Sequence, residues 1–213
     1  MSTDLLNESR VASDRGVDGL LWAALAAPIV YFSTVIVAAL FYPGYSHVKQ
    51  YASELGSASA TCPWLFNTGI VTLGALALLG GVGYERGLRS LGVGRFLSLV
   101  TGLVVGLFGV SMILGGLFPM PDERHGGFGL GLGVHLGPLL LLIALRGPLG
   151  SRGPRLFLGV SLVLMIALFA IMMGVGGLVT RANVGLIQRA YALTLFPWIS
   201  VGAWHVLRLR RRR

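Results

Sequence analysis

Six apolar stretches of 19 to 26 residues occupy most of this 213-residue sequence. A helix rises ~1.5 Å per residue, so each stretch is about long enough to cross a hydrocarbon core of ~30 Å. They run from Val17 to Tyr42, Pro63 to Tyr84, Phe96 to Met120, Gly127 to Leu145, Leu156 to Thr180 and Gly185 to Leu207. We therefore predict an all-α polytopic membrane protein, built as a bundle of six transmembrane helices.

Basic residues are concentrated in alternate gaps around these stretches. Of the 17 Lys and Arg residues, 13 precede the first stretch or follow the second, fourth or sixth. The remaining four are Lys49, Arg124 and Arg181 in the other gaps, and Arg189 near the start of the last stretch. Short loops rich in Lys and Arg stay on the cytoplasmic side of a membrane. This asymmetry predicts that both termini are cytoplasmic and that the gaps after the first, third and fifth stretches face outward.

The formal net charge of +9 would suggest nucleic-acid binding in a soluble protein. Here the charges lie at the ends of predicted crossings, so we expect membrane lipids as partners and no nucleic acid. The run from Arg210 to Arg213 is expected to contact anionic headgroups, at about 1 kcal/mol per residue. Neither composition nor charge predicts an oligomeric state.

The predicted domain organisation is simple. Residues 1–16 mix acidic and basic side chains, unlike a secretory signal, and are expected to form a disordered cytoplasmic tail. Residues 17–207 form the six-helix domain, and residues 208–213 form a basic cytoplasmic tail. No gap exceeds about twenty residues, so any active site must be built from helices and short loops.

Glycine and proline indicate how the crossings pack. Among 32 glycines, two sets recur every four residues and predict close helix contacts: Gly102 with Gly106, and Gly129 with Gly133 and Gly137. Proline lies within the first, fourth and sixth crossings, at Pro28, Pro138 and Pro197. Each is expected to kink its helix or to free a backbone carbonyl.

The first outward gap carries one group of candidate site residues. At helical spacing, His47, Gln50 and Glu54 share one side and Val48, Tyr51, Ala52 and Leu55 another, with Ser46 as a possible N-cap and Gly56 as a stop. The pattern predicts a short amphipathic helix at the membrane interface. Its polar side either contributes to a site or is simply solvated.

A second group lies in and below the next outward gap. Asp122 and His125 are close enough in sequence to form an acid and base pair or to bind one divalent metal ion. His135 follows about 12 Å deeper, near mid-membrane, where a histidine either bonds a neighbouring helix or marks a functional site. Asn67, one turn into the second crossing, is its expected polar neighbour.

These residue types suit three kinds of chemistry if they converge on one outward-open pocket. Histidines with carboxylates can bind zinc and activate water, carboxylic acids can donate protons, and both can relay protons in a transporter. No H-E-x-x-H, G-x-S-x-G, P-loop or C-x-x-C pattern selects among them. The cofactor and metal content therefore stay open.

Two segments carry a family resemblance: Y-S-H-V-K-Q-Y-A-S-E-L-G at residues 45–56, followed by Pro63 and Asn67, and G-G-L-F-P-M-P-D-E-R-H-G at residues 115–126. The sequence resembles the bacterial and archaeal integral membrane family catalogued as domain of unknown function 998. The resemblance implies a six-helix protein of the inner membrane, with Ser53, Glu54, Asp122 and His125 at the polar motif positions. It implies no reaction. The sequence is also distantly similar to zinc-dependent membrane hydrolases, but it lacks the H-x-x-x-H element that those enzymes carry.

The leading functional hypothesis is an extracytoplasmic pocket that binds, and in an enzyme version processes, a lipid-like or amphiphilic molecule. Glu54, Asp122, His125, His135 and Asn67 would line it. In the enzyme version His125 and His47 would hold a metal or act as base, Glu54 or Asp122 would carry the proton, and Ser53 would orient the substrate. The alternatives are a small proton-coupled transporter that uses His135 and Glu54, and a non-catalytic membrane assembly partner.

Overall fold

A computed structural model of the chain describes the backbone of residues 2–213 and the side chains from Asp14 onward. The disordered tail that we predict at residues 1–16 falls mainly on residues 1–13. The side chains of residues 1–13 lie outside this description, so the disordered tail stays a prediction. Every described element is helical, as the sequence predicted.

The described chain has seven α-helices and four 3-10 helices. The α-helices are α1 (Ser2–Leu40), α2 (Pro63–Ser90), α3 (Arg95–Leu117), α4 (Gly137–Ala144), α5 (Arg152–Met172), α6 (Val184–Leu195) and α7 (Pro197–Arg210). The 3-10 helices are η1 (Ala52–Gly56), η2 (Glu123–Leu136), η3 (Gly147–Leu149) and η4 (Val175–Gly177).

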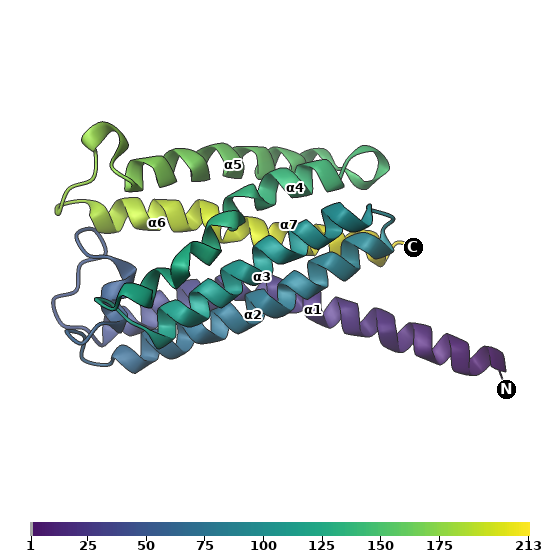
Figure 1. Cartoon of the computed structure of the whole chain (residues 1–213), viewed down its shortest axis with the longest axis horizontal. Coiled ribbons are helices and arrows are strands. Elements are labelled where there is room, and N and C mark those ends of the chain that lie inside the picture. Colours follow the sequence, from purple (N-terminus) through teal and green to yellow (C-terminus); the bar gives the residue numbers. More distant parts are fainter. Residues whose placement is uncertain (1) are drawn as a thin grey trace.

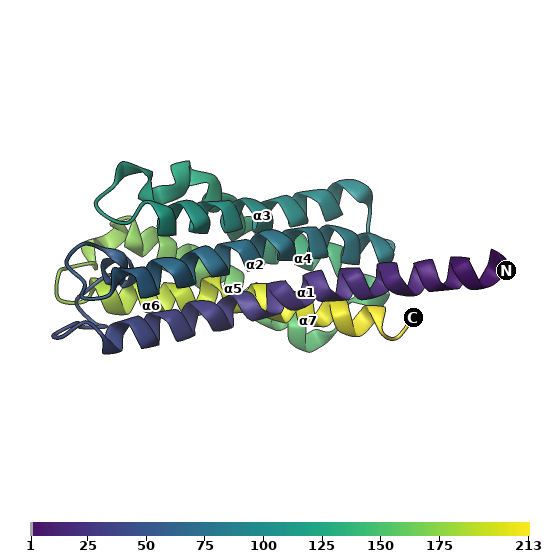
Figure 2. The ribbon, with the colours of Figure 1, turned by 90° about the horizontal axis from the view of Figure 1, so that it is seen from below.

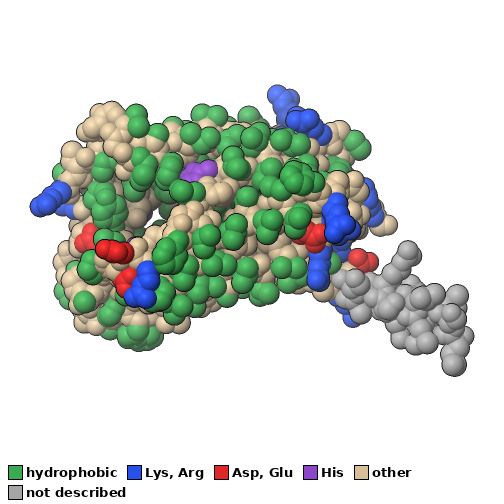
Figure 3. Space-filling view, viewed as in Figure 1, with side chains coloured by type: hydrophobic (Ala, Val, Ile, Leu, Met, Phe, Trp, Pro, Cys, Tyr) green, Lys and Arg blue, Asp and Glu red, His purple; other side chains and the backbone are tan. Residues whose placement is uncertain are grey.

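Six segments of the described chain are long and apolar enough to span a membrane. They are Asp14–Leu40, Pro63–Ser90, Arg95–Leu117, Glu123–Ala144, Arg152–Met172 and Val184–Arg210. Figure 3 shows hydrophobic side chains over the middle of the bundle and charged side chains toward its two ends. The chain is a multi-pass membrane protein with the predicted number of crossings.

The crossings run roughly antiparallel, so the connections gather at two ends of the bundle (Figures 1 and 2). We call the end that carries residues 41–62 the loop end. The opposite end carries both chain termini, and we call it the terminal end. The 13 basic residues of the arginine-rich gaps belong to the terminal end by their order in the chain.

Glycines allow α2 and α3 to pack backbone against backbone. A Cβ added to Gly81 would lie 2.6 Å from the carbonyl oxygen of Gly102, and one added to Gly102 would lie 2.6 Å from that of Gly81. Gly74 and Gly109 repeat this relationship seven residues away. Such contact suits helices in lipid, where association depends on close packing rather than on the hydrophobic effect. The prediction for Gly102 is confirmed.

The fourth crossing is not the continuous helix that the sequence predicted. Gly127, Phe128 and Gly129 have positive φ angles, and a regular α-helix begins only at Gly137. A Cβ on Gly127 would lie 2.5 Å from the Ser111 hydroxyl, so the chain turns tightly against α3 here. The proposed glycine face at residues 129, 133 and 137 is therefore wrong as a helical face, although Gly137 does contact the ring of Trp198 closely.

Proline interrupts the sixth crossing between α6 and α7. Pro197 lacks an N–H group, and Ile199 N donates to Phe196 O at 3.1 Å, three residues back rather than four. Pro138 lies at the start of α4, where its missing N–H costs nothing. The first crossing differs, because α1 continues through Pro28 as one helix.

A buried arginine joins three helices at the terminal end. The Arg210 side chain is only 7% exposed, and its guanidinium lies 3.0 Å from carboxylate oxygens of both Asp14 and Asp18 on α1. It also bonds the hydroxyl of Ser90 at the end of α2. Arg210 therefore fixes α7 against α1 and α2, and is not a free basic residue of the tail.

Candidate functional site

The loop between α1 and α2 folds down onto the loop end of the bundle. The Ala52 amide donates to Gln188 Oε1 on α6 at 2.6 Å, and Asn67 Nδ2 on α2 donates to Gly56 O at 3.0 Å. Both ends of η1 are thus held by amide side chains from the bundle. Ala52 and Leu55 are buried beneath it, which explains the apolar side of the predicted amphipathic helix.

That predicted helix is replaced by a turn and one short 3-10 helix. The Ser46 amide donates to Gln50 Oε1 at 2.8 Å, which closes a separate turn before η1 begins. Glu54 then accepts from the Tyr51 amide at 2.8 Å and from Gln50 Nε2 at 3.0 Å. Both carboxylate oxygens of Glu54 therefore have partners within the loop, and Glu54 is not among the residues that line the cavity described below.

Arg189 on α6 fastens the first half of the loop. Its Nη1 donates to Gln50 O at 2.8 Å and to Gly185 O at 2.9 Å, while Nη2 donates to the Tyr45 hydroxyl. Its Nε donates to His47 Nδ1 at 3.2 Å. Because a guanidinium only donates, His47 Nδ1 must accept and carry no proton.

Burial, followed by the positive charge of Arg189, lowers the pKa of His47 below its usual 6.5. Both effects favour the neutral imidazole that this hydrogen bond needs. His47 thus serves as an acceptor for Arg189 in the loop and is not among the residues that line the cavity.

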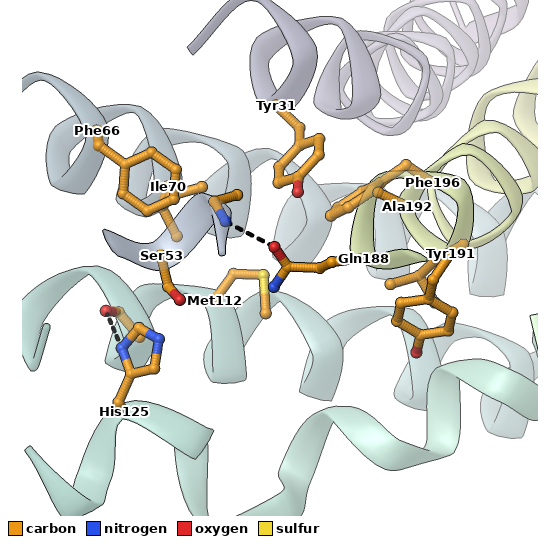
Figure 4. A pocket seen from close by; sticks show the side chains of 13 residues that line it. Tyr31, Ser53, Phe66, Ile70, Met112, His125, Gln188, Tyr191, Ala192 and Phe196 are labelled. Carbon is orange, nitrogen blue, oxygen red and sulfur yellow. Dashed lines mark hydrogen bonds between the residues drawn. The ribbon is translucent and has the colours of Figure 1, made fainter. Parts of the chain in front are cut away.

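A cavity of about 180 Å³ lies beneath η1, between α1, α2, α3 and α6. Its apolar lining is Tyr31, Ala52, Phe66, Ile70, Met112, Ala192, Leu195 and Phe196, and its other lining residues are Ser53, Gly115, His125, Gln188 and Tyr191 (Figure 4). Tyr31 lies nine residues before the end of α1, so the cavity reaches about 13 Å into the bundle. The ring of Tyr31 stacks on that of Phe196 at 3.9 Å.

His125 presents one ring nitrogen to this cavity in a defined tautomer. Its Nδ1 lies 3.1 Å from Gly115 O and 3.0 Å from Phe118 O. Carbonyl oxygens only accept, so Nδ1 carries a proton, and in the neutral ring Nε2 carries the lone pair. In Figure 4 this second nitrogen points to the side of the cavity where Ser53 lies. The Ser53 hydroxyl lies 3.1 Å from Met120 Sδ.

His135 forms a separate pair at the edge of the cavity. Its Nδ1 donates to Leu132 O at 2.8 Å, so Nε2 accepts the 2.6 Å hydrogen bond from the Tyr191 hydroxyl. Tyr191 itself lines the cavity, whereas its hydroxyl points away from it in Figure 4. His135 therefore touches the cavity only through Tyr191, and not through Asn67 as the sequence suggested.

Asp122 pairs with its own neighbour at the surface. Arg124 donates from its backbone N and Nε to Asp122 Oδ1, each at 2.9 Å, and its Nη2 lies 2.7 Å from Oδ2. These hydrogen bonds from Arg124 lower the pKa of Asp122 to about 2. Asp122 is therefore an ionised partner of Arg124, and it is not among the cavity-lining residues.

Of the seven site residues predicted from sequence, Ser53 and His125 line one cavity. Glu54, Asn67 and His47 hold the loop, Asp122 pairs with Arg124, and His135 pairs with Tyr191. Among side chains 14–213, no group of three His, Cys, Asp or Glu residues is arranged to hold a metal ion. The catalytic and ligand-binding roles of all seven stay predictions.

Sequence reasoning missed Gln188, whose amide both holds η1 and faces the cavity. A polar amide next to Arg189 within an otherwise apolar stretch was the available signal, because an uncharged polar group buried in a bundle needs a partner.

One protein-family model matches most of the chain. The family model described as "Protein of unknown function (DUF998)" matches residues 25–205, which include the cavity and the loop. The chain belongs to the DUF998 family. The resemblance noted at residues 45–56 and 115–126 is thereby confirmed. A search of curated proteins found no match, and neither did a search of solved structures. Membership of DUF998 therefore supplies the family and no activity.

Proposed function

We propose that this DUF998 protein binds the apolar part of a lipid-like or amphiphilic molecule in the cavity beneath η1, at the extracytoplasmic face of the cell membrane. The observation that carries the proposal is the make-up of the cavity. Aromatic and aliphatic side chains form most of its wall, while Ser53, His125 and Gln188 place polar atoms toward the loop. An apolar pocket with a few convergent polar groups is the usual form of a ligand site.

The orientation of the site rests on charge. The arginine-rich gaps lie at the terminal end, which the positive-inside asymmetry assigns to the cytoplasm. The loop end and its cavity would then face outward. The family resemblance, and not the charge pattern, implies a prokaryotic inner membrane as the location.

The cavity volume limits the kind of occupant. Drug-sized ligands usually occupy pockets of ~300 Å³ or more, whereas an engineered cavity of ~150 Å³ binds benzene. At about 180 Å³, this cavity suits one ring or one short stretch of hydrocarbon chain. The rest of the molecule would extend toward Ser53 and the loop, as expected for an amphiphile with its polar end near the membrane surface.

Photolabelling tests this proposal. A diazirine-bearing fatty acid is incubated with the purified protein, irradiated, and mapped by peptide mass spectrometry. We expect labels on cavity-lining residues of α3 and α6. Ala192→Phe, which puts a ring into the cavity, should strongly reduce them. Leu193→Phe, one residue further along and 61% exposed, is the matched control and should not. Labels confined to the lipid-facing surface, or equal labelling in both variants, would contradict the proposal.

Catalysis at His125 is a second candidate function, favoured by the fixed tautomer. A protonated Nδ1 held by two carbonyl oxygens leaves Nε2 as a potential general base facing the cavity, with the Ser53 hydroxyl among the neighbouring lining residues. If His125 is catalytic, the His125→Gln variant should no longer convert lipids from a prokaryotic extract into products. Photolabelling of the cavity should persist in that variant. Conversion that survives His125→Gln would exclude this role.

The transporter and assembly-partner hypotheses make different predictions. A proton-coupled carrier should lose pH-driven uptake in proteoliposomes on His135→Ala. An assembly partner should keep its cellular function when the cavity-lining polar residues Ser53, His125 and Gln188 are all replaced by alanine.

A further inference from the structure

A groove separate from the η1 cavity lies at the terminal end, on the outer surface between α1 and α7. It has a volume of about 310 Å³ and is lined by Trp22, Trp204, Leu207, Arg208, Arg211 and Arg212. Both indoles are half exposed, Trp22 at 49% and Trp204 at 45%. The groove is far from the η1 cavity and shares no residue with it.

Two of the arginines lie over the two indoles. The Arg208 guanidinium carbon is 5.4 Å from the centre of the Trp204 ring, and that of Arg211 is 6.0 Å from the Trp22 ring. A guanidinium over an aromatic face keeps its N–H edge available for a planar or tetrahedral anion. The aromatic rings therefore hold the cations in place without neutralising them.

The charge of the groove is poorly balanced by the protein. Among carboxylates at or after residue 14, only Asp18 forms an ion pair within the groove, 3.9 Å from Arg211 Nε. The other oxygen of Asp18 lies 3.0 Å from the buried Arg210, so one carboxylate serves two arginines. Arg210 is already paired with Asp14 and Asp18. The basic C-terminal residues therefore divide into Arg210, which is buried between helices, and an outward-facing set in the groove.

The position suits a phospholipid. Tryptophan is enriched at membrane interfaces, and basic clusters at the cytoplasmic ends of crossings attract anionic headgroups. Below Trp22, the exposed side chains of Ile29 and Ile36 continue along the same face of α1 at intervals of seven residues. They form an apolar surface along which acyl chains can lie.

We infer that the groove formed by Trp22, Trp204, Arg208, Arg211 and Arg212 is a binding site for an anionic phospholipid. The phosphate contacts the arginines, and the acyl chains follow α1 into the bilayer. The site would anchor the terminal end of the bundle to the anionic lipid of its leaflet. Headgroup contact, expected from the sequence at Arg210 to Arg213, is here proposed for Arg208, Arg211 and Arg212.

Tryptophan quenching by brominated lipids tests this inference. The Trp64→Phe variant removes the exposed tryptophan of the loop end, and leaves the half-exposed Trp22 and Trp204 with the buried Trp198. The protein is reconstituted in phosphatidylcholine that contains a small fraction of brominated phosphatidylglycerol or brominated phosphatidylcholine. We expect clearly stronger quenching by the brominated anionic lipid.

Matched charge variants decide whether the groove is responsible. Arg208→Gln with Arg211→Gln should abolish the preference, with relative affinity falling roughly fivefold per arginine removed. The control variant, Arg152→Gln with Arg155→Gln, removes the same charge beside α4 and α5, outside the groove. It should retain the preference for the anionic lipid. Equal quenching by both lipids, a preference that survives the groove variant, or equal loss in both variants would each overturn the inference. Thermal unfolding of each variant checks that the fold is kept.

Discussion

Gly74 on α2 and Gly109 on α3 approach so closely that a Cβ on either would lie 2.5 Å from the carbonyl oxygen of the other. Real Cβ contacts are not that short, and the opposing atoms are backbone, which cannot move aside as a side chain would. Together with Gly81 and Gly102, this pair brings the backbones of α2 and α3 into direct contact.

We therefore predict that Gly109→Ala destabilises the fold by about 1–3 kcal/mol, the usual cost of overpacking. Gly159→Ala is the control, because a Cβ at Gly159 on α5 would meet no atom within 4 Å. Thermal unfolding in detergent should show a lower Tm for Gly109→Ala and an unchanged or slightly higher Tm for Gly159→Ala. Similar Tm values for the two variants would contradict the close packing of α2 on α3.

Arg189 is expected to hold the loop over the cavity through its three contacts with Tyr45, His47 and Gln50. Arg189→Lys keeps the charge but cannot present the guanidinium fork to Gln50 O, Gly185 O and Tyr45 together. We predict a loss of about 1–3 kcal/mol and faster hydrogen exchange in residues 45–56. Arg181→Lys, at an exposed position of the same end, should change neither. Unchanged exchange in the Arg189 variant would show that the loop is held by other contacts.

The contact between Arg189 and His47 should make loop stability depend on pH. The folded pKa of His47 is lowered, so the ring is neutral in both folded and unfolded chains well above pH 6.5. As the pH falls below about 6.5, the unfolded chain binds a proton first, and stability decreases until the folded ring is protonated as well. Hydrogen exchange of residues 45–56 between pH 8 and 5 measures this trend, after correction for the intrinsic exchange rate.

In the control variant His47→Asn, the amide oxygen can still accept from Arg189 but does not titrate. The decrease in protection below about pH 6.5 should be smaller in this variant. The same pH trend in both proteins would assign it to another group.

The hydrogen bond from Tyr191 to His135 should contribute to stability within the bundle. Tyr191→Phe leaves His135 Nε2 without its donor, and we expect a loss of about 1–3 kcal/mol. Tyr42→Phe removes a hydroxyl that contacts the exposed Ser59 at 3.3 Å and should cost far less. Thermal unfolding compares the two. An equal effect would mean that the His135 contact is no stronger than a surface one.

Periodicity and hydropathy were enough to predict the six crossings, because each crossing must bury its backbone polar groups in a helix. They did not predict where a crossing stops being helical. The positive φ angle of Phe128 lies beside the close packing of Gly127 against Ser111, a contact between residues 16 positions apart that no local pattern reveals.

The candidate site could be predicted only in part for a related reason. Ser53 and His125 were found because they lie in loops with unusual polar content. Glu54 and Asp122 bond their own sequence neighbours, so polar residues that the sequence predicts in one pocket are satisfied locally instead. Gln188 was missed because its role depends on η1, which lies 136 residues away in the chain.

The break at Pro197 gives the last crossing two separate anchorages. Gln188 and Arg189 on α6 bond the loop that covers the cavity, while Arg210 on α7 bonds α1 and α2. A continuous helix would transmit a tilt at one end to the other end. A helix break at which backbone hydrogen bonds are missing need not transmit it. We therefore expect a change in the tilt of α6 to leave the contacts of α7 with α1 and α2 in place.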